Sequence, residues 1–428
     1  MTSRDRLLKA LAGGIPDRLP VTTHHLMPTF LDRFCEGAAP LAFFERFGLD
    51  PILWLAAHRP DSGAGHFFCP QQPGFALPAP PSCSGSDDVP APSGSDGVPA
   101  LTGSQASPVS PASLEPRWIE SDEWRIEIEP VPDGPHETSR YRITTPAGQL
   151  QTVLRAAPET AWVIERLIKE QSDIDLIARY APAPLCDTEA VNRAAGDFGE
   201  RGIVRGTVPG FDIYGQPGCW QDAAVLVGIE ELILATFDDP AWVRTLLDIL
   251  RERKLIWLDS SAGARFDLLE LGGGDASSTV ISPAIFEEFV APWDSVLIAA
   301  AHEAGQRVVY HTCGGMMPLL ELIAAMEPDA METFTPPTLG GDSDLAEARA
   351  VLGSQVCMIG GFDQARFFTG CSPADTRRAV RACFESAGQE GAYILAPSDH
   401  FFTAESALIE AFADEARACI YSNPGRQV

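Results

Sequence analysis

The sequence predicts an α/β protein of (β/α)8 TIM-type barrel architecture, with an inserted hairpin and linker excursion. Strand-like and helix-like patterns alternate through the C-terminal half, eight strand candidates are present, and polar side chains gather where these strands end. Such alternation is typical of a parallel sheet. An open doubly wound sheet is the alternative, but the chain lacks the Gly-x-Gly-x-x-Gly fingerprint of dinucleotide-binding folds.

Short apolar runs bounded by turn residues predict the strands. Helices are expected between them. Two begin at Ser282–Pro283 and Ser372–Pro373, with serine as N-cap and proline as the first helical residue, and a third begins at Asp239–Pro240. In chain order the expected strands are Leu19–Thr23, Ile52–Ala56, Ile203–Thr207, Phe266–Leu271, Arg307–His311, Ala330–Phe334, Val356–Ile359 and Ala392–Ala396.

One long excursion, residues 58–202, separates the second and third strands. Its segment 70–116 is rich in proline, serine and glycine and contains a near-repeat, so it predicts a disordered insertion. Segment 117–150 predicts a hairpin insertion that caps the barrel mouth, because Trp124–Glu129 and Ser139–Thr145 alternate as strands around a turn. Apart from these insertions, residues 1–428 are expected to form one barrel domain.

Composition excludes several classes of protein. The 428 residues are 45% hydrophobic, which is ample for a large core. A net charge of −28 disfavours nucleic-acid and anionic-lipid partners. No apolar run reaches the roughly 20 residues of a membrane helix, and the N-terminus lacks a signal-peptide core. The ten scattered cysteines predict reduced thiols in the cytoplasm. The oligomeric state stays open.

Candidate site residues follow the strands, because barrel enzymes place their chemistry at the carboxyl ends of strands. His311 and Cys313 stand one residue apart at such an end, and this pair of donors suits zinc. Glu332 lies within an apolar strand, where a buried carboxylate needs a partner, so a ligand or substrate role is expected. The other candidates are His24, His25, Glu270, Asp275, Asp363, Gln364, Asp399 and His400.

Roles divide among these candidates by chemistry. Glu270, Asp275 and Asp363 are candidate catalytic carboxylates that orient a substrate or accept its proton. We expect His24, His25 and Gln364 to bind the substrate. Some polar residues have structural interpretations instead: Asp212 as the N-cap of a helix, Cys357 in the core, and Cys371 and Cys383 in a helix and at its N-terminus.

Short motifs in order along the chain resemble uroporphyrinogen decarboxylase-like proteins, and the resemblance covers nearly the whole chain outside 70–116. It implies a TIM-type barrel, in agreement with the count of strands. True decarboxylases of this family carry an arginine-rich segment after the first strand, where this chain has Thr22–Pro28, so porphyrinogen decarboxylation is not expected. The motifs are Ser3–Leu11, Pro16–Val21, Ser282–Pro292, His302–Gly305, His311–Gly314 and Gly360–Asp363.

A second branch of the family contains cobalamin-linked methyltransferases, which bind zinc through a His-x-Cys motif and a cysteine after the last strand. His311 and Cys313 match the motif, but Asp399 stands where the cysteine is expected, next to His400. Both are competent zinc ligands, and Glu332 is a candidate fourth. An open position on the metal would let a substrate thiol or hydroxyl bind and lose its proton.

The resemblance therefore implies a zinc-dependent methyltransferase, or a demethylase component, that moves a methyl group between a corrinoid on a partner protein and a small-molecule thiol or other nucleophile. One alternative is a metal-free lyase or decarboxylase that uses the acidic cluster Glu270, Asp275 and Asp363. Another is a non-catalytic barrel that binds a corrinoid or a small ligand.

Overall fold

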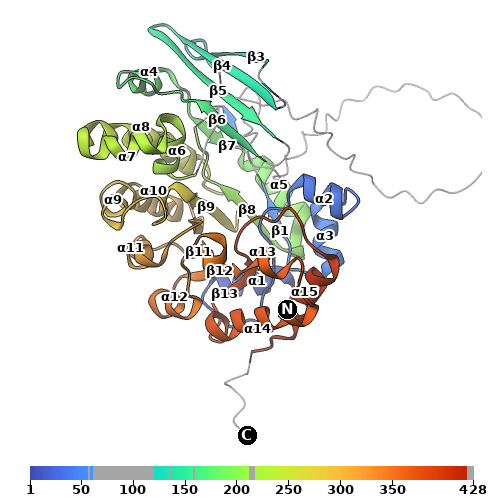
Figure 1. Ribbon diagram of the computed structural model, residues 1–428. Coiled ribbons are helices and arrows are strands. Elements are labelled where there is room, and N and C mark those ends of the chain that lie inside the picture. The colour runs from blue at the N-terminus through green and yellow to red at the C-terminus, as the bar shows by residue number, and fades with distance from the viewer. Residues whose placement is uncertain are drawn as a thin grey trace, which may run out of the picture.

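A computed structural model describes residues 1–55, 58–60, 120–132, 134, 136–157, 160–211 and 217–421. Its centre is a curled parallel sheet of seven strands in the order β1-β8-β9-β10-β11-β12-β13, with helices around it (Figure 1). This confirms the α/β class. The strands are β1 (Ile52–Trp54), β8 (Ile203–Thr207), β9 (Leu268–Gly272), β10 (Val308–His311), β11 (Ala330–Thr333), β12 (Cys357–Phe362) and β13 (Tyr393–Pro397).

The expected first strand, Leu19–Thr23, is reduced to a single parallel bridge between Val21 and Leu395 of β13. Around this bridge, Thr22 N–H donates to the Leu395 carbonyl and Leu395 N–H donates to the Pro20 carbonyl, each over 2.9 Å. On the other side, the N–H of Asp50 donates to the Val21 carbonyl. The segment therefore lies between β13 and the residues that lead into β1.

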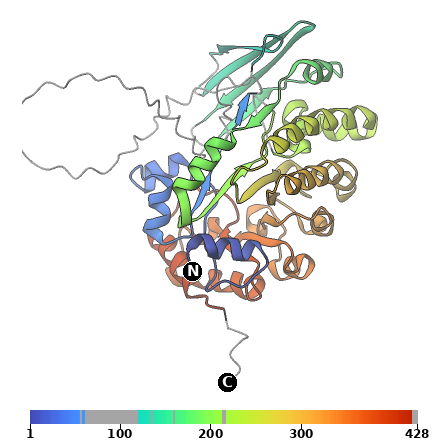
Figure 2. The ribbon, with the colours of Figure 1, turned by 180° about the vertical axis from the view of Figure 1, so that it is seen from behind.

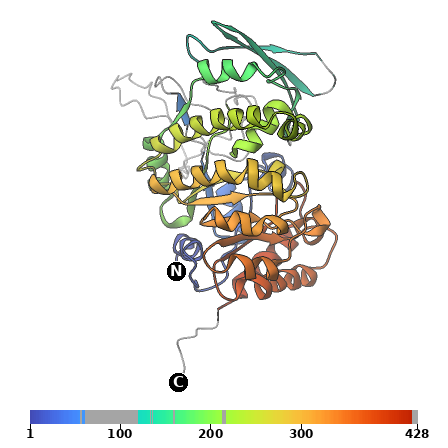
Figure 3. The ribbon, with the colours of Figure 1, turned by 90° about the vertical axis from the view of Figure 1, so that its left-hand side faces the viewer.

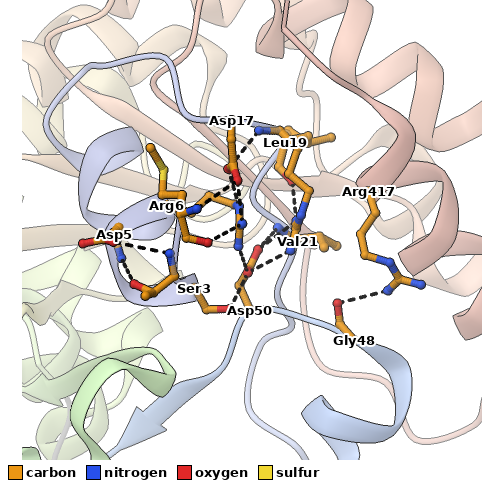
Figure 4. Close-up of polar contacts among 12 residues, drawn as sticks. Ser3, Asp5, Arg6, Asp17, Leu19, Val21, Gly48, Asp50 and Arg417 are labelled. Atoms are coloured by element: carbon orange, nitrogen blue, oxygen red, sulfur yellow. Dashed lines mark hydrogen bonds and ion pairs between the residues drawn. The ribbon is translucent and has the colours of Figure 1, made fainter.

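Asp50 fastens this segment to the N-terminal helix α1 (Ser3–Leu11), as Figure 4 shows. Its buried carboxylate accepts from Val21 N–H over 3.0 Å, from the Ser3 hydroxyl over 2.7 Å, and from Arg6 Nη1 over 2.7 Å. Arg18 adds two contacts of 3.1 Å. Seen from behind, α1 lies across the rear of the sheet, where it packs on β13 and β8 (Figure 2).

The expected helix starts are confirmed. The side chains of Ser282, Ser372 and Asp239 cap their helices by accepting from backbone N–H groups three residues on. The outer helices are α2 (Pro28–Phe34), α3 (Pro40–Phe47), α6 (Cys219–Val227), α7 (Ile229–Asp238), α8 (Pro240–Ser260), α9 (Pro283–Phe289), α10 (Ala291–Glu303), α11 (Leu320–Ala325), α12 (Leu345–Leu352), α13 (Gln364–Phe367), α14 (Pro373–Cys383) and α15 (Ser406–Ala418).

The excursion between β1 and β8 carries a four-stranded antiparallel sheet, β3-β4-β5-β6. The two strands expected around the turn are β3 and β4, which pair from Arg125↔Thr144 onward. Figure 3 shows this sheet beside α4, at one end of the molecule. Segment 70–116 lies outside the described residues. The elements are β2 (His58–Pro60), β3 (Arg125–Pro130), β4 (Glu137–Thr145), β5 (Gly148–Ala156), β6 (Ala161–Glu165), α4 (Asp173–Tyr180), β7 (Pro184–Cys186) and α5 (Thr188–Phe198).

Within the described ranges, none of the helices is both long enough and apolar enough to span a membrane. The cysteines described there are free thiols. Cys357 is buried in β12, in agreement with its expected place in the core, and Cys383 ends α14.

Candidate active site at the carboxyl ends of the strands

A buried ion network joins three strands at the centre of the site. Arg205 of β8 donates from Nη2 to Glu270 of β9 over 2.7 Å and from Nη1 to Glu332 of β11 over 2.8 Å. Burial lowers the pKa of Arg205, but the charges of Glu332 and Glu270 raise it above its usual value. Burial raises the pKa of Glu332, but Arg205 and His311 together hold it well below its usual range. Arg205 and Glu332 are therefore both charged.

His311, the last residue of β10, is oriented by Glu332. Its Nδ1 lies 2.8 Å from Glu332 Oε1 and 4.0 Å from Glu270 Oε1. Burial lowers the pKa of His311, but hydrogen bonds with Cys313 and Glu332 raise it well above its usual value. A carboxylate that holds one imidazole nitrogen leaves the other nitrogen for a metal ion or a substrate. Nε2 of His311 is therefore the candidate metal ligand, and the Cys313 thiol lies beside the ring.

His24 follows the Val21 bridge and reaches the same place from the other end of the chain. Its Nδ1 accepts from the His25 N–H over 2.9 Å. Its Nε2 is buried, 3.8 Å from Glu332 Oε1, and has no hydrogen-bond partner among the residues the structure describes. Burial, with the charge of His400, lowers the pKa of His24 to about 3, so the ring is neutral at neutral pH. In the neutral tautomer that this contact favours, Nε2 carries the proton.

A second carboxylate–imidazole pair follows β13. Asp399 Oδ1 lies 2.8 Å from His400 Nδ1 and also accepts the His400 backbone N–H over 2.7 Å. Burial raises the pKa of Asp399, but the hydrogen bond from His400 lowers it below its usual value overall. The His400 ring centroid lies 4.7 Å from that of His24 and 5.3 Å from that of His25. Four histidine rings therefore meet at this end of the sheet.

Two groups of side chains within the described ranges could hold a metal ion, and His24 belongs to both. In each group the ligand atoms lie within 4.8 Å of one another. Among the expected ligands, His311 and Glu332 fall in the first group and His400 falls in the second. Cys313 and Asp399 belong to neither, but each contacts a histidine that does. The groups are His24, His311 and Glu332, and His24, His25 and His400.

The remaining candidates have partners within the protein. Asp275 accepts from Gln221 Nε2 over 2.8 Å, and burial raises the pKa of Asp275. Asp363 caps α13 through the Arg366 N–H and also accepts from Thr338. Gln364 Oε1 accepts from the Ser398 N–H and hydroxyl. These contacts hold the loops after β9, β12 and β13. Asp212, expected to be an N-cap, lies outside the described residues.

Sequence reasoning missed Arg205, Thr22 and Thr23. All three are buried and line a cavity at the site together with His24 and Glu332. The two threonine hydroxyls and Arg205 Nε have no hydrogen-bond partner within the described part of the chain. Arg205 did carry a signal, because a charged residue within an apolar strand needs a partner, as Glu332 does. The threonines carried none.

The curled parallel sheet, with a polar cluster at the carboxyl ends of its strands, defines an α/β protein of the TIM-barrel type. Residues 211–417 match the family model for uroporphyrinogen decarboxylase (URO-D), which confirms the resemblance seen in the motifs. No curated protein matches the chain.

One solved structure shows a similar fold at low sequence identity, and a second aligns over part of the chain. A methyltransferase from Methanosarcina mazei aligns over 97% of this chain and 98% of its own, with 14% identity and a TM-score of 0.57. A B12-independent methionine synthase from Shewanella sp. W3-18-1 aligns over 56% of this chain and 73% of its own, with 11% identity and a TM-score of 0.33. The first likeness shows a shared fold over the full length of both chains.

Proposed function

We propose that the protein is a zinc-dependent methyltransferase, or the demethylase component of such a system, that moves a methyl group between a corrinoid and a small-molecule thiol or other nucleophile. The observation that carries this proposal is the placement of His311. Glu332 fixes its Nδ1 over 2.8 Å, so that Nε2 is left as a donor beside the Cys313 thiol. The superfamily match and the fold shared with the Methanosarcina mazei methyltransferase support it.

The donor set fits zinc, since imidazole, thiolate and carboxylate are its usual ligands. His311 and Cys313 would hold the ion, and Glu332 and His24 would be nearest to a third position, because their ligand atoms lie within 4.8 Å of that of His311. Asp399 and His400, expected from the sequence as the third ligand, follow β13 as a hydrogen-bonded pair. When bound, zinc supplies Lewis acidity that favours the thiolate form of a coordinated substrate thiol. The thiolate is the nucleophile that accepts a methyl group.

The protein's own residues would position the substrate and manage its proton. Arg205 fixes Glu332, and Glu332 holds Nδ1 of His311. His24 lines the cavity, and His25 packs beside it against Trp54. Glu270, 4.0 Å from His311, is the carboxylate placed to take the substrate's proton. Asp275, Asp363 and Gln364 are proposed to position the loops around the substrate.

The finer features of the fold belong to the same proposal. The Val21 segment would act as the eighth strand and close the barrel between β13 and β1. The free thiols suit the reducing cytoplasm, where a corrinoid protein would be the partner.

The test is a methyl-transfer assay on the full-length protein loaded with zinc. Methylcobalamin is the donor, small thiols are the acceptors, and loss of the methyl–cobalt absorbance is followed. We expect His311→Ala to lower the rate by at least about 100-fold, because loss of a partner that only orients a ligand already costs about 10–100-fold and this variant removes a ligand. The control is His302→Ala on α10, a half-exposed histidine that pairs with Asp329. Rates equal to those without enzyme for every thiol, or full activity in His311→Ala, would contradict the proposal.

A metal-free lyase acting on a carboxylic acid is the second candidate. The observation in its favour is the buried Arg205, whose Nε has no partner among the described residues and faces the cavity with Thr22 and Thr23. A guanidinium N–H is a strong donor to a carboxylate. Release of CO₂ from candidate acids by chelator-treated enzyme, retained in His311→Ala, would favour this function over methyl transfer.

A further inference from the structure

We propose that His24, His25 and His400 form an all-imidazole site for a divalent transition-metal ion, separate from the zinc site at His311 and Cys313. The ligand atoms of these three side chains lie within 4.8 Å of one another. With metal–nitrogen bonds of about 2.1 Å, tetrahedral ligand nitrogens lie about 3.4 Å apart. The observed separations are therefore at most about 1.4 Å wider than a tetrahedral site requires.

His400 is already arranged as a metal ligand. Its Nδ1 is held by Asp399 over 2.8 Å, and the same carboxylate oxygen is fixed by the His400 backbone N–H over 2.7 Å. Histidine ligands in proteins commonly donate one ring N–H to a carboxylate, which leaves the other nitrogen for the metal. The carboxylate of Asp399 also supplies negative charge next to the cation without using a ligand position.

His24 supplies an independent observation that a ligand is missing. Its side chain is 5% exposed, yet Nε2 has no hydrogen-bond partner among the residues described. A buried polar atom left without a partner is destabilising, and a bound ion would remove that penalty. Binding through Nε2 moves the ring proton to Nδ1, so the 2.9 Å contact from His25 N–H must be given up.

Ligand chemistry sets the class of ion. Imidazole nitrogens suit Zn²⁺, Cu²⁺, Ni²⁺ and Fe²⁺, whereas Mg²⁺ and Ca²⁺ require oxygen ligands. His24 belongs to both candidate groups, but one imidazole nitrogen binds only one ion at a time. Cys313 gives the first site a ligand that does not depend on His24. We therefore expect two ions per chain, one with a thiolate ligand and one without.

Cobalt titration of the metal-stripped, full-length protein separates the two sites. A thiolate ligand gives Co²⁺ an intense near-ultraviolet charge-transfer band, whereas an all-imidazole site gives only weaker visible bands. We expect two Co²⁺ per chain. Cys313→Ser should abolish the charge-transfer band and keep the visible bands of the second ion. His25→Gln and His400→Gln should keep the charge-transfer band and abolish the visible bands of the second ion. Asp399→Asn should weaken binding of the second ion about 10–100-fold. His302→Gln is the control and should change neither ion.

Each outcome decides between the sites. Two ions, one of them lost in His400→Gln, support the all-imidazole site. His400 is half-buried, so this variant serves if the buried His25 variant fails to fold. A single ion with the charge-transfer band, unchanged in affinity by His25→Gln or His400→Gln, overturns this inference and leaves the zinc proposal standing. A single ion without that band, lost in His400→Gln, supports the all-imidazole site and overturns the zinc site at His311 and Cys313. Absence of any bound Co²⁺ overturns both.

Discussion

Arg205 and Glu332 are 127 residues apart in the sequence, and the Nη1 of one donates to the Oε2 of the other over 2.8 Å. Both side chains are buried. Glu332 of β11 in turn holds Nδ1 of His311 of β10. Arg205 of β8 therefore orients His311 through Glu332. The pair is therefore a structural support for the site as well as part of it.

Replacing the arginine should destabilise the fold strongly. Arg205→Met leaves Glu270 and Glu332 as buried carboxylates without their shared cation, and such a loss costs about 3–5 kcal/mol of the free energy of unfolding. Urea denaturation measures it. Arg125→Met is the control, because that side chain is 68% exposed and its contact with Asp122 is 3.8 Å long. Equal effects of the two substitutions would show that the buried network adds nothing.

Asp50→Asn tests how the N-terminal segment is fastened. The amide keeps the shape of the side chain but removes the charge that Arg6 and Arg18 meet. We expect the free energy of unfolding to fall by about 3 kcal/mol and the amide proton of Leu395 to exchange faster, because its acceptor is the Pro20 carbonyl. Asp32→Asn, on the exposed face of α2, should change neither quantity. Unaltered exchange at Leu395 would refute this function of Asp50.

Asp294→Asn should remove a pH dependence of stability. Burial raises the pKa of Asp294 from 3.8 to about 6, although the Tyr310 hydroxyl donates to it. The folded state therefore binds a proton more tightly than the unfolded state, and stability is lost as pH rises between these values. The expected loss is about 3 kcal/mol.

The Asn variant should match the wild type below about pH 4 and exceed it by about 3 kcal/mol above about pH 6. Chemical denaturation over this range measures the difference, with Asp259→Asn on the exposed face of α8 as control. A difference that grows toward low pH would have the wrong sign and would reject the raised pKa.

The strands were predictable because each is a local property of the sequence. The apolar run at Ile203–Thr207 has the bounds of β8, and the other runs differ from the observed strands by up to three residues. Strand ends depend on hydrogen bonds with neighbouring strands, which a local run does not encode. The Val21 segment has few such bonds, so it forms a bridge where a strand was expected.

The site was only partly predictable. His311 and Glu332 were expected as ligands because a donor at a strand end and a buried carboxylate carry their own signals. Their direct contact depends on the alignment of β10 with β11, where the two residues are register partners. The approach of His24 to His400 depends on how the chain's two ends meet beside β13. No local pattern reports either relationship.

For Asp275 and Asp363, the sequence pattern did not distinguish a catalytic carboxylate from one that supports a loop. Each follows a strand, as a catalytic acid would, but Asp363 caps a helix and Asp275 is bound by Gln221. An aspartate after a strand suits both purposes, since a helix N-terminus and an active site occupy the same loop in a β/α unit. Only the contacts of the folded chain separate the two.

The zinc content of the full-length protein, purified without added metal, decides whether His311 and Cys313 form a zinc site. Elemental analysis per chain compares the wild type, His311→Ala, Cys313→Ser and the control His302→Ala. We expect His311→Ala and Cys313→Ser each to lose about one equivalent of zinc relative to the wild type and the control, since each lacks a ligand of the same ion. Zinc content and methyl-transfer activity in Cys313→Ser equal to those of the wild type would contradict this expectation and return Cys313 to a structural thiol.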